Sequence, residues 1–261
     1  MRKTVGRRQT NTNSVIHMAK FVPGTTVFRS ALSLDKKAEL DHVLVEGQVV
    51  SVSGRSATVD FRNSIGQKTV GTVSLHLHVS FLLIEIGDFG NETANLDPLA
   101  QSIQTFLRLL ISDSSLVKFI KIRSSGELEY ALEHYGSYSH IIFVGHGSKK
   151  GNLHAGSHEK ISSQSFADMI AMFCKSKPTF ISMCCHSGEA AFAKRVSNTI
   201  ECGAFIAPKG AIHSCSASQF VQTFLGFHIL EGMRLKSAFD RARECTPGSA
   251  ALRMWKNGVI Q

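Results

Sequence analysis

HIIFVGHG, residues 140–147, runs through large apolar side chains and stops at a histidine between two glycines. Such a run, apolar at successive positions and not only at alternate ones, is typical of a strand covered on both faces of a sheet. SFLLIEIGD at 80–88 and TFISMCC at 179–185 have the same character. These three segments predict the central strands of the fold.

Segments with helical spacing separate the predicted strands. Apolar residues recur three and four positions apart in DPLAQSIQTFLRLL (97–110), SGELEYALEHY (125–135) and SSQSFADMIAMFCK (162–175). The alternation continues with strands at 117–124 and 204–210, and with helices at 188–197, 215–232 and 234–244. It predicts an α/β domain, residues 80–261, with a mostly parallel sheet and helices on both faces.

Residues 1–79 follow a different pattern. HVLVEGQVVSVSG, SATVDF and KTVGTVSLHLHV alternate between apolar and polar residues and are separated by turn residues, which predicts a small antiparallel β unit. The first twenty residues hold five basic side chains and no acidic one, and we interpret them as a solvated tail. His76 and His78 share one face of a strand and lack further ligands nearby, so we expect exposed histidines there and no metal site.

The composition narrows the class of protein. A chain of 261 residues that is 43% apolar can bury a substantial core. It has neither an apolar run long enough to span a bilayer nor the apolar stretch of a secretory signal, so we expect a cytoplasmic protein without a membrane partner. Its six cysteines are interpreted as reduced thiols. The net charge of +9 is scattered and no nucleic-acid motif accompanies it, which argues against a nucleic-acid partner.

Two of the predicted strands end in residues that can carry out chemistry. His146 closes one strand and Cys185 closes the next. The two positions are 39 residues apart (185 − 146), which leaves room for one crossover helix. Neighbouring strands lie about 4.8 Å apart, and α/β folds bind ligands at the carboxyl ends of their strands. We therefore expect both side chains in one cleft. A helix starting after Cys185 would stabilise a thiolate, and Gly147 and Gly188 would let a substrate backbone approach closely.

FVGHGS and ISMCCHSG together resemble the caspase-like cysteine peptidases, which include metacaspases, separases and bacterial CHAT-domain proteins. Cys-His-Ser-Gly at 185–188 is similar to the metacaspase nucleophile motif, and residues 222–244 are similar to the helices that end CHAT domains. The resemblance covers about residues 80–245. It implies a caspase-like fold and a cysteine endopeptidase without a cofactor or metal. It also implies a peptide or protein substrate, a partner that activates or inhibits the enzyme, and a role in bacterial antiviral defence or cell death. By the same association, residues 1–79 would be a regulatory region that senses a signal or docks a partner.

The resemblance also implies roles for individual residues. His146 would be the general base and acid, Cys185 the nucleophile, and the backbone N–H groups of Gly147 and Cys185 the oxyanion hole. One position departs from the family: metacaspases have an aspartate two residues before the nucleophile, where this chain has Met183. Asp88, which ends the first predicted strand, is a candidate substitute in the substrate pocket and could equally cap a turn.

Other residues near the motif have simpler interpretations. Cys184 is expected to face away from Cys185 into the core, because successive residues of a strand point to opposite faces. His186 is expected to face solvent. His154 and His158 lie four residues apart, but the intervening Ala-Gly-Ser argues against the helix that would bring them together on a zinc ion.

Two other classes of function stay open. One is a catalytically silent caspase-like module that binds a partner or acts as a scaffold; the presence of both Cys185 and His146 argues against it. The other is a thiol redox enzyme that uses Cys184 and Cys185, and the absence of the usual Cys-x-x-Cys spacing counts against that class.

Overall fold

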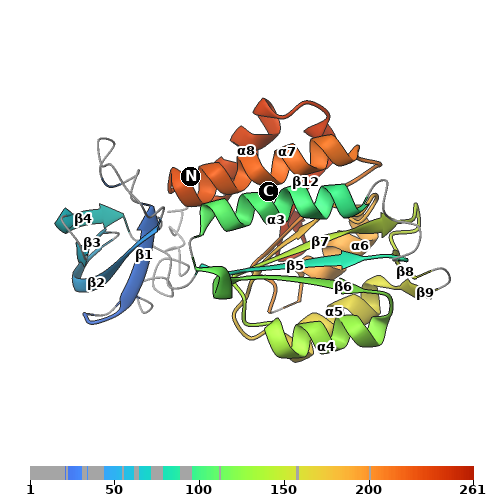
Figure 1. Cartoon of the computed structure of the whole chain (residues 1–261), viewed down its shortest axis with the longest axis horizontal. Helices are drawn as coiled ribbons and strands as arrows, with labels where there is room; N and C mark the ends of the chain where they lie inside the picture. The colour runs from blue at the N-terminus through green and yellow to red at the C-terminus, as the bar shows by residue number, and fades with distance from the viewer. Residues whose placement is uncertain are drawn as a thin grey trace, which may run out of the picture.

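A computed structural model describes residues 21, 23–30, 34, 44–54, 56–61, 65–71, 79–88, 96–111, 113–156, 159–199 and 201–261. The described chain forms two sheets. A four-stranded antiparallel sheet lies near the N-terminus, and a nine-stranded sheet flanked by helices forms the larger part of the molecule (Figure 1).

The larger sheet is mostly parallel, as the sequence predicted. In spatial order its path runs through β13 (Val259–Ile260), β12 (Leu252–Lys256), β11 (Ala204–Pro208), β10 (Thr179–Ser182), β7 (His140–Gly147), β5 (Phe81–Ile86) and β6 (Val117–Ile122). The strands from β11 to β6 are parallel, whereas β12 and β13 pair antiparallel at one edge. Every residue of β5 is buried, which explains its nearly continuous apolar sequence. A short hairpin, β8 (Leu153–Ala155) and β9 (Glu159–Ile161), pairs with the end of β7.

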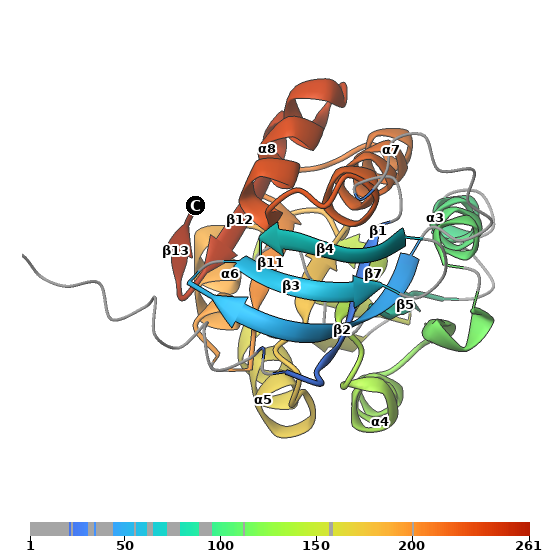
Figure 2. The same cartoon turned by 90° about the vertical axis from the view of Figure 1, so that its left-hand side faces the viewer.

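Helices cover both faces of the sheet. On one face lie α3 (Leu96–Leu110), α7 (Ser214–Leu225) and α8 (Leu235–Cys245); on the other lie α4 (Ser125–Tyr135), α5 (Ser163–Phe173) and α6 (Ala190–Ser197) (Figures 1 and 2). The structure also has three short helical segments: η3 (Ser114–Leu116), the π-helical η4 (Gly226–Leu230) and η5 (Ser249–Ala251). Among the described helices, none is both long and apolar enough to cross a membrane.

Serine side chains cap the start of α4 and of α5. The hydroxyl of Ser124 accepts the N–H of Glu127 at 3.1 Å to start α4, and that of Ser162 accepts the N–H of Ser165 at 3.1 Å to start α5. Ser125 is the first residue of α4 and is not its cap. The structure uses Ser125 differently, because its hydroxyl and amide both bond the Glu159 carboxylate of β9.

The N-terminal sheet has a core of its own. It consists of β1 (Thr26–Ser30), β2 (Leu44–Ser53), β3 (Ser56–Phe61) and β4 (Gly66–Gly71), in that order. Its buried residues are Phe21, Val27, Val45, Val49, Ala57, Val59 and Phe61. The antiparallel β unit is thus confirmed, with β1 as an additional strand. His76, His78 and the basic first twenty residues lie outside the described residues, and the domain boundary near residue 79 stays a prediction.

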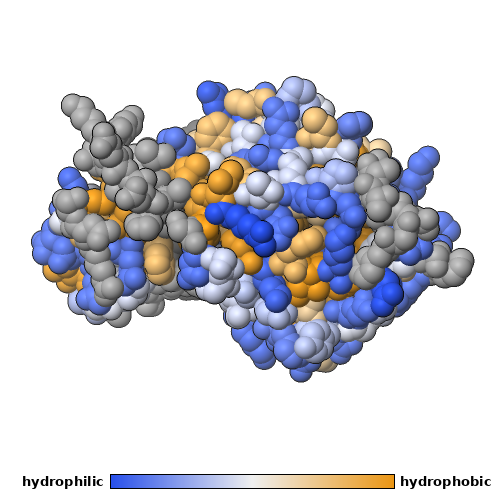
Figure 3. All heavy atoms as spheres, viewed as in Figure 1, coloured by the Kyte–Doolittle hydropathy of each residue, from blue (hydrophilic) through white to orange (hydrophobic). Residues whose placement is uncertain are grey.

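The N-terminal sheet packs against the α/β unit through β1. Phe28 of β1 contacts the core beneath α3, α7 and α8, and β1 contacts η4. Figure 3 shows apolar residues gathered where the two parts meet. The contact lies at the end of the large sheet away from β8 and β9 (Figure 1).

Candidate active site

The register between β7 and β10, and the close backbone approach of Cys185 to Gly147, place Cys185 at the end of β7 that carries His146. Ile181 lies opposite Ile142 in this parallel pair, and four residues further along each chain are Cys185 and His146. Ile142 and Ile181 both belong to the core beneath α3, α7 and α8. Because side chains alternate along β7, His146 falls on this same face at the carboxyl edge of the sheet. Cys185 lies three residues past the end of β10, and its thiol reaches the same side, since it contacts the carbonyl of Ile212, a residue that packs against this core.

Cys185 and Cys184 have different environments. Cys185 is half-buried, and its thiol donates to the carbonyl of Ile212, 3.9 Å away in the loop before α7. Cys184 is fully buried in the core beneath α4, α5 and α6, and burial raises the pKa of its thiol to about 12. The expectation that Cys184 is a core residue is therefore confirmed. Because the two thiols point to opposite faces, they are poorly placed to act as a redox pair.

The turn that follows Cys185 is fixed against β11. The N–H of His186 donates to the carbonyl of Gly210 at 2.9 Å, and the N–H of Gly188 donates to the carbonyl of Pro208 at 2.8 Å. A Cβ at Gly188 would lie 2.5 Å from the carbonyl oxygen of Ala207, so this position needs glycine. His186 has φ +62°, in the left-handed region that non-glycine residues rarely adopt.

Ser187 ties the turn to the strand before it. Its buried hydroxyl donates to the carbonyl of Cys184 at 2.7 Å and lies 2.8 Å from the hydroxyl of Ser182. The Ser182 hydroxyl also accepts the N–H of Cys184 at 3.3 Å. The Ser-Gly of the motif thus has a local physical role: it holds the nucleophile candidate in a rigid turn between β10 and α6.

The backbones of Gly147 and Cys185 touch. A Cβ built on Gly147 would lie 1.9 Å from the carbonyl oxygen of Cys185, closer than any real contact. Among the described residues no acceptor is found for the N–H of Cys185, although the N–H groups of its neighbours Cys184 and His186 are both bonded. The amide expected in an oxyanion hole therefore has its donor available.

The structure separates the remaining predicted residues from this contact. Asp88 is half-buried just after β5, and β5 lies on the opposite side of β7 from β10. Met183 is only 3% exposed and packs in the core beneath α7. His146, Gly147 and Cys185 are thus brought together, with Asp88 one strand further away.

One histidine of this region was missed as a site residue. His154 lies directly opposite His146 in the antiparallel pairing of β7 and β8. Its sequence context correctly excluded a helix, but a strand of three residues leaves almost no periodic signal. Only the pairing of β8 with the end of β7 reveals the contact.

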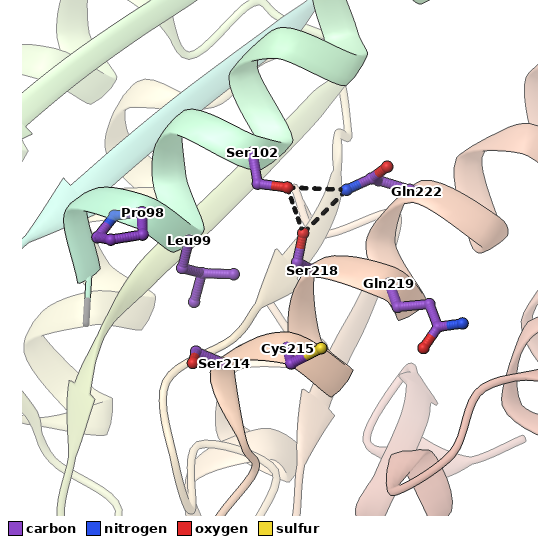
Figure 4. A pocket seen from close by; sticks show the side chains of 8 residues that line it. All are labelled: Pro98, Leu99, Ser102, Ser214, Cys215, Ser218, Gln219 and Gln222. Carbon is purple, nitrogen blue, oxygen red and sulfur yellow. Dashed lines mark hydrogen bonds between the residues drawn. The ribbon is translucent and has the colours of Figure 1, made fainter. Parts of the chain in front are cut away.

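A pocket of about 410 Å³ lies between α3 and α7. It is lined by Pro98, Leu99, Ser102, Ser214, Cys215, Ser218, Gln219 and Gln222 (Figure 4). The Ser102 hydroxyl is 2.8 Å from that of Ser218, and the Gln222 amide donates to both, at 3.1 and 2.9 Å. The lining carries no charged side chain. Ser214, one of the lining residues, comes two residues after Ile212, whose carbonyl contacts the Cys185 thiol. The pocket therefore adjoins the loop that contacts the Cys185 thiol.

Within the described part of the chain, no three His, Cys, Asp or Glu side chains are grouped so that they could hold a metal ion. All six cysteines are unpaired.

No protein-family model matches the chain, and no curated protein matches it. Among solved structures, it is similar to a secreted C11 cysteine protease from Bacteroides thetaiotaomicron, determined by X-ray in complex with an irreversible peptide inhibitor. The sequence identity is 8%, the match covers 69% of this chain and 67% of the protease, and the TM-score is 0.48. A likeness of this size assigns no family, and the residues of the site carry the proposal that follows.

Proposed function

We propose that this protein is a caspase-like cysteine endopeptidase in which Cys185 is the nucleophile and His146 is the general base and acid. The observation that supports the proposal is the backbone contact between Gly147 and Cys185, which brings a half-buried thiol to the end of β7 that carries His146. A cysteine nucleophile needs such a base within reach and a donor for the oxyanion, and this edge of the sheet offers both.

The reaction proceeds through a thioester. The Cys185 thiol gives its proton to the His146 imidazole, and the resulting thiolate attacks the carbonyl carbon of the scissile peptide bond. The carbon–nitrogen bond then breaks as protonated His146 gives its proton to the leaving amine. Water, whose proton passes to His146, hydrolyses the thioester, and the proton returns to the Cys185 sulfur.

The developing oxyanion is bound by backbone donors. The N–H of Cys185, which has no acceptor among the described residues, is one of them, and the N–H of Gly147 is the second. Donors held by a rigid turn cost no reorganisation when charge develops on the oxygen. The hydrogen bonds of Ser187 and Gly188 supply that rigidity.

Substrate selection uses the surroundings of this edge. Asp88 would attract a basic side chain, whereas buried Met183 contributes shape and no charge. The uncharged pocket between α3 and α7 would take a neutral polar residue of the substrate, because serine and glutamine side chains line it. Cleavage of a peptide library distinguishes these subsites: Asp88→Ala should lose any preference for lysine or arginine, and an unchanged preference would remove Asp88 from the pocket.

The same proposal includes regulation. The family resemblance favours an effector that a partner protein activates or inhibits, within bacterial antiviral defence or cell death. The N-terminal sheet supports a docking role, because it has its own core and contacts the α/β unit at β1.

Site-resolved alkylation tests the proposal. With iodoacetamide followed by mass spectrometry, Cys185 should react fastest of the six cysteines in native protein, and His146→Ala should slow it by roughly 10²-fold or more. Cys184→Ala is the matched control and should leave the rate unchanged. His186→Gly tests the neighbouring histidine as an alternative base and should also leave it unchanged.

A substrate screen then separates an enzyme from a silent module. Peptides cleaved by the native protein and not by Cys185→Ala would support the endopeptidase. Equal alkylation of Cys185 in native and denatured protein, together with no cleavage that depends on Cys185, would overturn the proposal in favour of the binding module.

A further inference from the structure

A line of polar side chains crosses the carboxyl edge of the sheet. His146 of β7 lies opposite His154 of β8, and His154 lies opposite Lys160 of β9. Leu153, the neighbour of His154 on β8, packs into the core beneath α4, α5 and α6. His154 therefore projects to the opposite face, which is the face that carries His146 and Cys185.

The β8–β9 hairpin lies along the side of β7 that is away from Cys185. Gly156, just after β8, would bring a Cβ within 3.0 Å of the Arg123 carbonyl at the end of β6. The carboxylate of Glu159 in β9 accepts the N–H of Ser125 at 3.1 Å, which anchors the hairpin to the first turn of α4. Figure 1 shows β8 and β9 together at this end of the sheet.

His146 is consequently flanked on both sides. Cys185 lies on its β10 side and His154 on its β8 side, with Lys160 one strand further out. Cross-strand neighbours of this kind have Cβ atoms about 5 Å apart, within the reach of two imidazole rings. This is the position that the third group of a catalytic triad occupies, on the side of the base away from the nucleophile.

The environment of His154 favours an uncharged ring that can accept a hydrogen bond. Burial lowers the pKa of His154, and the positive charges of Lys160 and of protonated His146 lower it further. Its Nε2 is buried and, among the described residues, has no hydrogen-bond partner. A buried polar atom without a partner is costly, so a donor that could reach it would be bound favourably.

We propose that His154 is a positioning residue, whose Nε2 accepts a hydrogen bond from the His146 ring nitrogen that faces away from Cys185. A rotation of the His146 side chain makes this bond, which the structure does not contain, and hydrogen bonds of this kind commonly tighten only when substrate binds. The bond fixes one tautomer and one orientation of the His146 imidazole, and leaves its other nitrogen to take the Cys185 proton. The inference rests on the proposed function only for the role of His146 as base.

Two variants test the hydrogen bond directly. His154→Phe keeps a flat ring and removes the acceptor, whereas His154→Gln retains a carbonyl oxygen that can accept. Nitrogen-15 NMR of the imidazoles at a pH where His146 is uncharged should show one predominant His146 tautomer in the parent protein and in His154→Gln, and both tautomers in His154→Phe. His134→Phe, on the exposed surface of α4, controls for the loss of a histidine. Equal tautomer populations of His146 in all these proteins would overturn the inference.

Kinetics provide the second readout. On a peptide cleaved by the parent, His154→Phe should lower kcat by about 10²-fold with little change in KM, and His154→Gln should recover most of the loss. If His154→Phe does not fold, His154→Ala removes the ring without adding bulk and should behave in the same way. An unchanged kcat in these variants overturns the inference alone. Cleavage that survives in Cys185→Ala overturns the proposed function, and the tautomer measurement still decides the role of His154.

Discussion

Glu85 is a charged residue in a strand that is otherwise apolar and buried. It is 1% exposed, and its carboxylate lies 3.3 Å from the ammonium of Lys121, which also binds Asp97 at 2.6 Å. Burial, followed by the hydrogen bond with Asp97, raises the pKa of Glu85 to about 7, and the attraction of Lys121 only partly opposes this. The carboxyl group is therefore half ionised near neutral pH.

This titration makes stability depend on pH with a definite sign. The folded pKa of about 7 lies above the ordinary value of 4.5, so between these values the folded state holds a proton that the unfolded state has lost. Glu85 therefore lowers the free energy of unfolding as pH rises through this window, by about 3 kcal/mol in total. The loss is complete about one pH unit above the folded pKa, where the carboxyl is ionised in the folded state as well.

Glu85→Gln should remove this dependence. Urea unfolding of parent and variant between pH 4.5 and 8 gives the contribution of Glu85 to the pH dependence of the free energy of unfolding, because the other titrating groups are common to both proteins. We expect the variant to gain stability relative to the parent as pH rises and to be the more stable protein above pH 7. A difference between the two proteins that does not vary with pH would contradict the assignment.

At the scale of elements, most of the central fold follows from periodicity. The strand at 140–147 and the helix at 125–135 have the bounds that their sequences predict, since a long apolar or amphipathic run offers few alternatives. The strand at 179–185 is shorter than expected and ends at Ser182, where the chain turns towards β11. The pattern cannot mark this end, because buried apolar residues continue past it.

Short strands and their pairings could not be predicted. β8 and β9 have three residues each, and β12 and β13 owe their place to pairing with β11 and with each other. The strands that end near His146 and Cys185 could therefore be predicted from the sequence, whereas the position of His154 next to His146 could not. Its position depends on a non-local contact between β8 and β7, which no local periodicity encodes.

The close approach of β7 to the turn after β10 has a consequence for reactivity. A Cβ at Gly147 would meet the carbonyl oxygen of Cys185 at 1.9 Å, so Gly147→Ala must push these two elements apart. Displacing a reactive group by even an ångström costs about 10²-fold in rate, and we expect a loss of this order in the alkylation of Cys185. The alkylation rate of Cys185 is measured by quenching the reaction at successive times and analysing the protein by mass spectrometry.

Gly126→Ala is the matched control for that experiment. A Cβ at Gly126, in the first turn of α4, would have no atom within 4 Å, so this variant should fold and react as the parent does. Unchanged alkylation of Cys185 in Gly147→Ala would show that the contact does not matter for reactivity.

At the scale of the whole molecule, the candidate site and the N-terminal sheet lie at opposite ends of the large sheet (Figures 1 and 2). The carboxyl ends of the parallel strands carry the candidate site. Helix α7 runs from there to the other end: its first turn follows the Ile212 loop that contacts Cys185, and η4 follows its C-terminal end. β1 contacts η4 and so covers the far end. A signal from the N-terminal sheet would have to travel along α7 or the strands.

Phe28 joins the two parts, since it extends from β1 into the core beneath α3, α7 and α8. Phe28→Ala should lower the free energy of unfolding of the α/β unit by about 1–3 kcal/mol, because the apolar contact is lost and a cavity is left. The alkylation rate of Cys185 should stay that of the parent, since the contact is at the far end of the sheet. Val27→Ala, fully buried in the separate N-terminal core, is the matched control and should leave the stability of the α/β unit unchanged. Hydrogen exchange measures the stability of the two cores separately. If alkylation of Cys185 is slower in Phe28→Ala but unchanged in Val27→Ala, β1 instead communicates with the candidate site through η4 and α7.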